Sequence, residues 1–541
     1  MKEKSLFWAD QLAEEILNRK KFKYVDKPVP KMKKFVVKTS ASISGVLHIG
    51  RLSDTIRSES VCKALLDTGH KAELIWVAED MDPLRKIPEG VPKTFEKYLG
   101  MPVTDIPDPF GCHASYADHN KSEYFSVLDQ FVSTKMTKYS MREEYKKGNF
   151  RPYIKNLLEK MEDVIKILNK YRTEPIKSGW SPWKPICENC GKIITPRILE
   201  FDGKFVRYVC EDYSFKTTTV KGCGYEGEND PLEGNGKLMW KGEWASQWAR
   251  WQVCSEGAGK EYQVPMSAWW VNGEIVEKIL DFPMPVPIFY EHLMFDNKKM
   301  SASLGNVVYP YQWLEVAPAE LLRFFYNKKL MKTRSFSWNF LPNLFDDYDQ
   351  HADVFFGKKS VENKREEEHM KRLFEMSQIK KPKDNARIPF SFATMISQLC
   401  DPKTQIDKAI EILKFTGHIK EVTEDDKKEI QKRLVFAKNW VNKYAPQMAI
   451  KVVEEPYKGE LTENEKNAIS MLAEELKKSW SEKELQFRIF EIARENSIEP
   501  ERFFKLCYNI LLGKDSGPRL GPFILVVGKE KVAKLLSEAS K

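Results

Sequence analysis

The sequence contains no long uninterrupted hydrophobic run. A helix that crosses a membrane needs about 20 consecutive apolar residues, whereas the longest runs here, such as Pro522 to Gly528, have the length of buried strands. The segment from Met1 to Asp10 mixes charged residues with a few apolar ones and lacks the hydrophobic core of a signal peptide. We therefore expect a cytoplasmic protein that has no membrane partner.

Cysteine is also scarce. Nine cysteines are scattered over 541 residues, and this odd number without a secretory signal argues against a disulfide framework. Four of them lie in one short stretch, a spacing that indicates metal binding. The other five have no close neighbour of their own kind, and we expect them to be core residues: Cys62, Cys112, Cys254, Cys400 and Cys507.

The composition is that of a folded, multidomain chain. Hydrophobic residues make up 42% and aromatic residues 12%, and the 30% of charged residues carry both signs. At about 100–200 residues per domain, the length corresponds to about three or four domains and excludes a single small binding module. The formal net charge of +9 favours binding of a polyanion without requiring it.

The beginning of the chain has the pattern of a nucleotide-binding fold. A strand is expected at Phe35 to Val37, a Ser/Gly-rich turn through Gly45, a helix from about Gly50 to Thr68 and a second strand at Glu73 to Ala78. This order predicts a strand–helix–strand unit with parallel strands. The strand-like segment Pro285 to Phe289, which a lysine-containing loop follows, indicates that the same sheet resumes there.

Helical periodicity dominates other regions. An amphipathic helix is expected within residues 1–30, and from about Pro318 the chain predicts a separate helical domain. The lysine-rich segment 357–383 is interpreted as a solvated face or a linker. Further helices are expected around Ser122–Lys147 and Lys155–Tyr171, in a region that has the texture of an insertion, and at Glu463–Trp480, Glu482–Asn496 and Glu501–Leu512.

The turn after the first strand is the first candidate site. It ends in His48-Ile49-Gly50-Arg51 and leads into the expected helix, whose first N–H groups and positive dipole end suit a phosphate. Glycine lets a ligand approach the backbone, and His48 can donate to a phosphoryl oxygen as negative charge builds. Taken alone, the His-Ile-Gly tripeptide is a weak signal, because a lone histidine is more often a structural residue.

A second candidate lies about 250 residues later, in Lys298-Lys299-Met300-Ser301-Ala302. A loop with adjacent ammonium groups and small hydroxyl residues can close over a triphosphate and neutralise pyrophosphate as it leaves. By itself it is also compatible with an exposed lysine turn. The two segments in this order, one after the first strand and one after the last, favour a nucleotide site.

Together the two segments resemble the paired signatures of class I aminoacyl-tRNA synthetases, and the wider pattern resembles the class I lysyl-tRNA synthetase family of archaea. The resemblance implies an α/β Rossmann-type catalytic domain with an inserted α+β zinc-binding connective region, followed by an all-α helical anticodon-binding domain. Further matching stretches lie along most of the chain: Glu79–Pro88, Trp240–Trp251, Pro287–Glu291, Arg387–Phe392 and Gly513–Ile524.

The resemblance also implies domain boundaries. The catalytic domain would comprise residues 1–100 and 236–317, the second part including the Lys-Met-Ser loop, with residues 101–235 inserted as the connective, acceptor-end region that carries zinc. Residues 318–385 would form stem-contact or linker helices, and residues 386–541 the anticodon-binding domain. The expected state is a monomer.

The reaction that the resemblance implies has two steps. The carboxylate of lysine attacks the α-phosphorus of ATP, pyrophosphate leaves, and the lysyl-adenylate is captured by the terminal ribose of tRNA(Lys), with Mg²⁺ accompanying the nucleotide. Positioning and charge stabilisation would do most of this work. The implied catalytic residues are His48, Lys298 and Lys299, and the implied ATP-binding residues are His48, Gly50, Lys299 and Ser301.

Lysine would be contacted by residues of several segments. The implied positions are Ser40, Ser42, Trp244, Tyr262 and Tyr290. An aromatic wall suits an ε-ammonium group, since a cation over an indole face gains about 0.5–2 kcal/mol when water is excluded. The i, i+4 spacing of the tryptophans between Trp240 and Trp251 equally predicts a buried helix face.

Some positions depart from the family pattern. Ala302 and Leu304 stand where family members carry a further lysine, and Lys298 is the expected substitute for that charge. Tyr262 stands where the family carries a histidine near the amino acid. The alternatives are therefore a synthetase for another amino acid, a tRNA-independent nucleotidyltransferase, or an inactive paralogue that binds tRNA.

The clustered cysteines form the clearest separate signal. Cys187 and Cys190 make a C-x-x-C knuckle, and Cys210 and Cys223 follow it with glycines beside the last thiol. Four thiolates suit one tetrahedral structural Zn²⁺, although the split second pair leaves an incomplete ligand set open. A closed site of this kind has no position for water, so we expect it to stabilise the insertion and not to take part in catalysis.

Overall fold

The computed structural model of the protein describes residues 5–43, 47–88, 90–177, 179–215, 218–300, 306–453 and 457–541. The chain forms two compact units, which divide it differently from the predicted boundaries at residues 318 and 386. Among the described residues, no helix is both long and apolar enough to cross a membrane. The first unit comprises Met1–Trp313, Ala319–Phe336 and His351–Lys381, and the second comprises Leu314–Pro318, Ser337–Gln350 and Pro382–Lys541.

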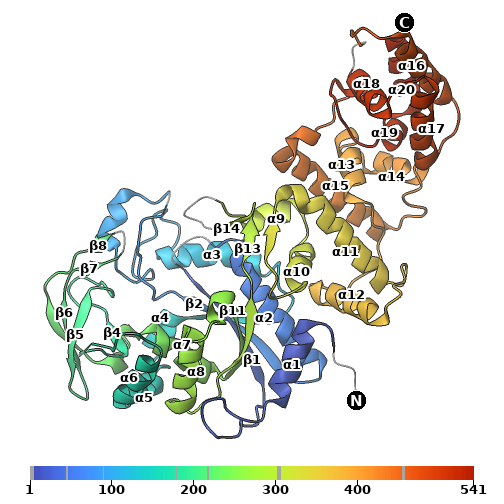
Figure 1. The fold of residues 1–541 in the computed structure, drawn as a ribbon. Helices are drawn as coiled ribbons and strands as arrows, with labels where there is room; N and C mark the ends of the chain where they lie inside the picture. Colours follow the sequence, from blue (N-terminus) through green and yellow to red (C-terminus); the bar gives the residue numbers. More distant parts are fainter. Residues whose placement is uncertain are drawn as a thin grey trace. The chain divides into compact units, whose positions relative to one another are not determined.

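A five-stranded parallel sheet forms the centre of the first unit (Figure 1). Its strands lie in the order β12-β11-β1-β2-β3, and each is parallel to its neighbour. The strand order reverses between β1 and β11, and α/β proteins bind ligands at the carboxyl ends of strands beside such a switch point. The bounds are Phe35–Ser42 (β1), Ala72–Glu79 (β2), Met136–Ser140 (β3), Val253–Gly259 (β11) and Val286–Tyr290 (β12).

The predicted strand–helix–strand unit is confirmed as β1, α2 (Ile49–Asp67) and β2. The first strand is longer than expected, because its pairing with β2 continues to Ser42 opposite Glu79. The sheet also differs from the prediction at β3, which lies within the region interpreted as an insertion. Helix α3 (Tyr116–Leu128) leads into β3 and α4 (Met141–Lys146) follows it, so the helix expected at 122–147 is interrupted by an edge strand. This strand has too little apolar alternation to be recognised.

Helices cover both faces of the sheet (Figure 1). On one face α2 packs against β1 and β2, and α1 (Trp8–Asn18), the short form of the expected amphipathic helix, packs on α2. On the other face α7 (Trp240–Trp251) contacts β11 and packs against α8 (Ala268–Lys278). Trp248 and Trp269 between these helices are fully buried. The buried-face interpretation of the tryptophan stretch is therefore confirmed for part of the helix.

The segment that carries the clustered cysteines is built of short elements. Strands β5, β6 and β9 form one antiparallel sheet, β4 pairs with β10, and β7 pairs with β8. The helix expected at Lys155–Tyr171 is two helices, α5 and α6, that meet at Lys160. The bounds are Arg151–Glu159 (α5), Met161–Lys170 (α6), Trp183–Pro185 (β4), Pro196–Phe201 (β5), Val206–Cys210 (β6), Tyr213–Ser214 (β7), Thr219–Val220 (β8), Glu226–Asn229 (β9) and Gly236–Leu238 (β10).

A small sheet follows β12. It has the order β14-β13-β15, with bounds Leu293–Phe295 (β13), Lys298–Lys299 (β14) and Arg334–Phe336 (β15). Asp296 and Asn297 connect β13 to β14 with φ of +48° and +62°, the left-handed pair that a two-residue hairpin turn requires. The helices that follow β14 in the sequence, up to residue 377, are α9 (Pro310–Val316), α10 (Ala319–Asn327), α11 (Leu341–Phe355) and α12 (Lys364–Ser377). Helix α12 occupies much of the lysine-rich segment and buries Met370, Leu373 and Phe374.

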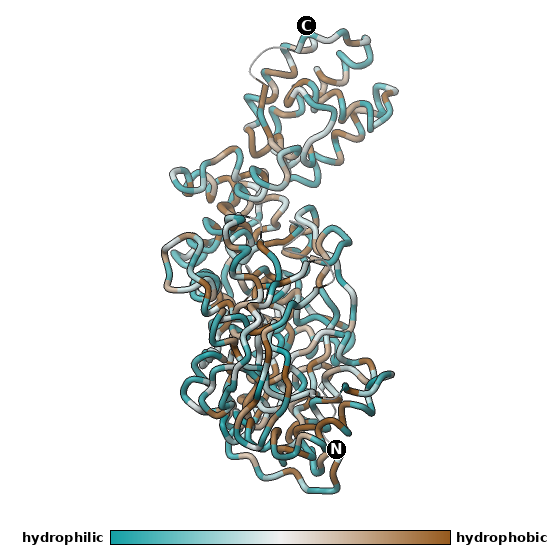
Figure 2. The backbone as a smooth tube through the Cα atoms, turned by 90° about the vertical axis from the view of Figure 1, so that its left-hand side faces the viewer, coloured by the Kyte–Doolittle hydropathy of each residue, from teal (hydrophilic) through white to brown (hydrophobic). Residues whose placement is uncertain are grey.

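The regular structure described for the second unit is helical. The three predicted C-terminal helices are confirmed as α16, α17 and α18, and α16 and α17 begin with capping boxes at Thr462 and Ser481. Brown and teal alternate along these helices, as amphipathic packing requires (Figure 2). The bounds are Phe390–Leu399 (α13), Ile406–Phe415 (α14), Glu424–Tyr444 (α15), Glu463–Glu475 (α16), Glu482–Glu495 (α17), Pro500–Leu512 (α18), Leu520–Val527 (α19) and Lys529–Ala539 (α20).

One expectation for this unit is wrong. The apolar run Pro522 to Gly528 has the length of a buried strand, but Pro522 to Val527 belong to helix α19 and Gly528 is its C-cap. Residues 520 to 526 of this helix are buried on every side. A helix that is apolar all round has no amphipathic period, so a short run of this kind cannot be distinguished from a buried strand by its pattern.

Candidate functional site

A cavity of about 590 Å³ lies at the carboxyl ends of the central strands. Its walls include the ends of β1, β2, β11 and β12, the start of α2, part of α7 and the β13–β14 hairpin. The cavity therefore occupies the switch point of the sheet. The predicted site residues that line it are Ser40, Ser42, His48, Gly50, Trp244, Tyr262, Tyr290 and Lys299.

His48 is the N-cap of α2. Its Nδ1 accepts a hydrogen bond from the backbone N–H of Gly50 across 3.1 Å. Burial lowers the pKa of His48 to about 4, with a smaller contribution from the Arg51 guanidinium. The ring is therefore neutral at pH 7, and because Nδ1 accepts, the ring proton resides on Nε2. The turn thus offers one neutral N–H donor beside the positive end of a helix.

Gly50 is required by the position of this ring. A Cβ atom at residue 50 would lie 2.8 Å from Cε1 and Nδ1 of His48 and 3.3 Å from Cε of Met300. Any larger residue would therefore push the imidazole off the helix end. The His48-Ile49-Gly50 pattern has a local cause, since the glycine makes room for the histidine to cap its own helix.

The paired lysines are separated by the geometry of their strand. Lys299 and Lys298 lie on β14 opposite Met294 and Phe295, and successive residues of a strand point to opposite faces. Lys299 lines the cavity and Lys298 does not. This geometry does not support Lys298 as a replacement for the missing lysine charge. Ser301 lies outside the described residues, together with Ala302 and Leu304.

The α2 side of the cavity contains a buried carboxyl group. Asp54 accepts hydrogen bonds from the hydroxyl of Thr39 and, at 3.1 Å, from the hydroxyl of Tyr290. Burial raises the pKa of Asp54 to about 6, against the effect of these two donors. The Arg57 guanidinium lies 4.7 Å from the centre of the Tyr290 ring. Since the Tyr290 proton is donated to Asp54, its oxygen faces a ligand as an acceptor, which suits an ammonium group.

An aromatic wall forms the α7 side. The ring of Trp244 lies parallel to Trp240, with centroids 5.9 Å apart and planes at 11°, and the Tyr262 ring meets Trp244 edge-on at 5.3 Å. Tyr262, which stands where the family carries a histidine, thus extends the aromatic wall. Both the ligand-facing and the buried interpretations of the tryptophans apply, because Trp240 and Trp244 line the cavity whereas Trp248 is fully buried.

A buried ion pair holds this wall in place. Glu256 on β11 accepts hydrogen bonds from the indole N–H groups of Trp244, at 2.9 Å, and Trp248. Its other oxygen lies 2.5 Å from the ammonium of Lys38, its direct neighbour on β1. Neither Lys38 nor Glu256 is exposed. One carboxylate therefore fixes two indole rings while its charge is balanced inside the sheet.

The cavity is also lined by acidic residues to which the sequence analysis assigned no role. Asp82 accepts from the hydroxyl of Ser42 at 2.9 Å and from Lys237 at 3.1 Å. Glu79 ends β2 directly opposite Ser42 in the register. The signal that could have identified Glu79 and Asp82 is their position at the end of a buried strand and just after it, where side chains reach the ligand edge of a parallel sheet.

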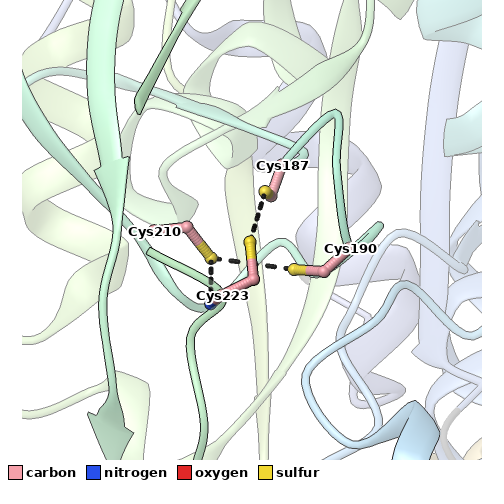
Figure 3. Close-up of side chains that lie close together, drawn as sticks. All are labelled: Cys187, Cys190, Cys210 and Cys223. Carbon is pink, nitrogen blue, oxygen red and sulfur yellow. Dashed lines mark hydrogen bonds between the residues drawn. The ribbon is translucent and has the colours of Figure 1, made fainter. Parts of the chain in front are cut away.

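The four clustered cysteines converge as predicted (Figure 3). The sulfur atoms of Cys187 and Cys223 are 3.6 Å apart, and those of Cys190 and Cys210 are 3.7 Å apart. A tetrahedral zinc with bonds of about 2.3 Å separates its sulfur ligands by about 3.8 Å, and all four thiols lie within 4.8 Å of one another. Gly191, next to the knuckle, has a φ of +70°. The donor set and its geometry therefore suit Zn²⁺.

A second group of potential metal ligands was not predicted. Asp108, Cys112, His113 and His119 place one ligand atom each within 4.8 Å of one another. The sulfur of Cys112 lies 3.1 Å from Nδ1 of His113 and 3.2 Å from Nδ1 of His119. Two imidazoles, one thiol and one carboxylate are ligands that zinc accepts. The sequence spacing Asp-x₃-Cys-His-x₅-His was the available signal.

This cluster corrects the interpretation of Cys112. It was expected in a core, but it is exposed, and it lies in the loop before α3. The expectation is confirmed for the other four isolated cysteines, which are buried: Cys62, Cys254, Cys400 and Cys507. A lone cysteine of this kind becomes a candidate ligand only when histidine and aspartate nearby in sequence are counted with it.

Comparison with known proteins gives a consistent result. The family model described as tRNA synthetases class I (K) matches residues 6–380, well over half of the chain. The chain is 34% identical over 549 residues to a lysine–tRNA ligase of Thermococcus kodakarensis and 32% identical over 550 residues to one of Methanocaldococcus jannaschii. It is 30% identical over 549 residues to one of Methanosphaera stadtmanae. Each comparison covers 98% of this chain and 99% of the relative.

Proposed function

The chain belongs to the class I tRNA synthetase family for lysine, and we propose on this basis that it attaches lysine to tRNA(Lys) through a lysyl-adenylate formed from ATP. One observation of the structure carries the proposal. The His48 turn and the Lys299 hairpin, about 250 residues apart in sequence, line one cavity at the switch point of a parallel sheet. Either segment alone would be compatible with a structural role, whereas their convergence supports a triphosphate site.

In the first step the lysine carboxylate attacks the α-phosphorus of ATP and the bond to the β-phosphate breaks. The proposed roles follow from the donors at each position. His48 Nε2–H and the N-terminal N–H groups of α2 would hold phosphoryl oxygens, and Lys299 would neutralise the departing pyrophosphate. Mg²⁺ would accompany the nucleotide. Ser301 lies outside the described residues, and its contact with ATP stays a proposal.

The amino acid would occupy the part of the cavity between α7 and the strand ends. The acceptor oxygen of Tyr290, held by Asp54, suits an ammonium group, and the Trp244 and Tyr262 rings form an apolar wall for the side chain. Ser40 and Ser42 at the end of β1 supply hydroxyl groups on the same edge. In the second step the terminal ribose hydroxyl of tRNA attacks the carbonyl carbon of the adenylate, and AMP leaves.

We propose a structural zinc ion at Cys187, Cys190, Cys210 and Cys223, and a second metal ion at Asp108, Cys112, His113 and His119. The sulfur spacings and the mixed nitrogen, sulfur and oxygen donors support these sites. Each group contains four protein ligands, so a tetrahedral ion has no open position for water. Both ions would stabilise the local fold, and neither would take part in the reaction, which would occur in the cavity.

The remaining parts of the chain would handle tRNA. The proposed division keeps residues 101–235 for the acceptor end, except that α3 and β3 are reassigned to the catalytic domain, whose sheet contains β3. Residues 318–385 would contact the stem and residues 386–541 the anticodon. Exposed aromatic residues of the helical part, such as Phe487, offer stacking surfaces for unpaired bases. The proposed oligomeric state is a monomer. Its location would be the cytoplasm.

Amino-acid-dependent exchange of pyrophosphate into ATP tests the function. The full chain should catalyse exchange with lysine and, with tRNA(Lys) added, form lysyl-tRNA. Exchange that depends on another amino acid would replace the proposed substrate. A protein that binds tRNA(Lys) but exchanges with none of the twenty amino acids would be the inactive paralogue.

A further inference from the structure

Four carboxyl groups line the cavity between β2, β11 and α7: Glu79, Asp82, Glu243 and Glu256. Three of them have basic partners. Lys38 lies 2.5 Å from Glu256, and Lys237 lies 3.1 Å from Asp82 and 3.0 Å from Glu243. Within the described part of the chain, Glu79 alone of the four has no basic side chain at ion-pair distance. A carboxylate in a cavity wall without a counter-charge is a position that a cation can complete.

An oxygen atom without a hydrogen-bond donor lies beside Glu79. Gln247 on α7 is 1% exposed and lines the same cavity. Its Nε2 donates to the two oxygens of Glu79 at 3.0 and 3.2 Å. Its Oε1 is buried and has no hydrogen-bond partner among the described residues. Buried acceptors are nearly always paired, so this oxygen indicates a missing donor.

The electrostatic surroundings of Glu79 point the same way. Burial raises the pKa of Glu79 to about 8, an effect that Glu243 from α7 and Asp82 after β2 increase and that Lys38 from β1 and Lys237 from β10 oppose. Without a ligand, the carboxyl group therefore holds a proton near neutral pH. A cation placed against it would supply the missing positive charge and displace that proton.

We propose, on the basis of the function above, that Glu79 and the free Oε1 of Gln247 together receive the ε-ammonium group of the lysine substrate. An ammonium group has three donors, a positive charge and no acceptor, which matches a carboxylate that lacks a counter-charge and an amide oxygen that lacks a donor. Trp244 lies on α7 three residues before Gln247, so its ring can cover the aliphatic part of the side chain next to the acceptors. Glu79 and Gln247 are thus specificity-determining residues, and the aromatic wall alone would not separate lysine from a neutral chain of equal length.

The test is pyrophosphate exchange by the full chain carrying Glu79→Gln. The KM for lysine should rise about 100-fold while the KM for ATP stays unchanged, because a hydrogen bond to a charged group is lost from amino-acid binding alone. The preference for lysine over 2-aminohexanoic acid, which lacks only the amine, should fall by a similar factor. Gln247→Met should show a smaller loss in the same direction.

Glu73→Gln is the matched control, since Glu73 lies on the same strand at its other end and pairs with Lys34. It should leave the KM for lysine unchanged. An unchanged KM for lysine in Glu79→Gln, with wild-type exchange intact, would overturn the assignment while the proposed function stands. Absence of lysine-dependent exchange in the wild-type protein would overturn the proposed function itself.

A measurement on the wild-type protein avoids any effect of the variants on folding. Calorimetric titration with lysine at pH 7, in two buffers of different ionisation enthalpy, should show release of protons to the buffer on binding. Titration with 2-aminohexanoic acid should not. Binding of lysine without proton release, or equal release with both compounds, would contradict the role of Glu79.

Discussion

Nδ1 of His48 accepts a hydrogen bond from the backbone N–H of Gly50 at 3.1 Å, so the histidine caps the helix that it introduces. This bond leaves Nε2–H as the donor to a ligand. His48→Asn should lower the rate constant of pyrophosphate exchange about 100-fold and leave the KM for lysine nearly unchanged, because the lost donor acts on the phosphates. His70→Gln, an exposed histidine outside the cavity, is the control.

The same residue gives a prediction about pH. The pKa of His48 is lowered to about 4 by burial, so the ring loses its extra proton as pH rises through about 4 and is neutral throughout the range from pH 6 to 8. The exchange rates of wild type and His48→Asn should therefore change in parallel across that range. A transition near pH 6.5 that occurs in the wild type and disappears in His48→Asn would contradict the neutral state.

Lys298 and Lys299 should differ in effect although they are adjacent. Lys299→Ala should reduce the rate constant of exchange about 100- to 1000-fold, since it removes a positive charge from the cavity wall, whereas tRNA affinity should change little. Lys298→Ala serves as the matched variant and should retain most of the activity. Equal losses of exchange in the two variants would contradict the different roles of Lys298 and Lys299. An equal loss of tRNA affinity and exchange in Lys299→Ala would contradict the role of Lys299 in the phosphate site.

The buried pair Lys38–Glu256 should behave as a coupled unit. Glu256→Gln leaves the Lys38 ammonium buried without a counter-charge, which should lower the free energy of unfolding by about 3–5 kcal/mol. In the double variant Lys38→Met/Glu256→Gln the loss should be smaller than in Glu256→Gln alone. Urea unfolding followed by tryptophan fluorescence measures these changes, and additive effects of the two substitutions would refute the coupling.

Measurement of the metal content tests the two proposed metal sites independently. The purified chain should hold two zinc ions by elemental analysis, and Cys187→Ser and Cys112→Ser should each remove one of them. Cys400→Ser should keep both, because Cys400 is a buried cysteine that belongs to neither cluster. A Cys187→Ser protein that retains both ions and its full thermal stability would eliminate the proposed ligand set.

The sequence alone was sufficient for features whose signal is local. The cysteine knuckle, the His48 turn before α2 and the capped helices α16 and α17 each depend on residues within a few positions of one another. Local hydrogen bonds and side-chain periodicity produce these patterns directly. The ligand-binding end of the sheet also followed from the strand–helix–strand order, because parallel strands place their carboxyl ends together.

Only the tertiary structure decided which distant groups are paired. Glu79 and Asp82 belong to one short segment, but Lys237 neutralises Asp82, whereas no basic side chain of the described residues lies at ion-pair distance from Glu79. Strand geometry likewise directed Lys299 and not Lys298 toward the cavity. Charge pairing across a sheet depends on which strands are neighbours and on which face a side chain lies, and neither is encoded in the spacing of residues along the chain.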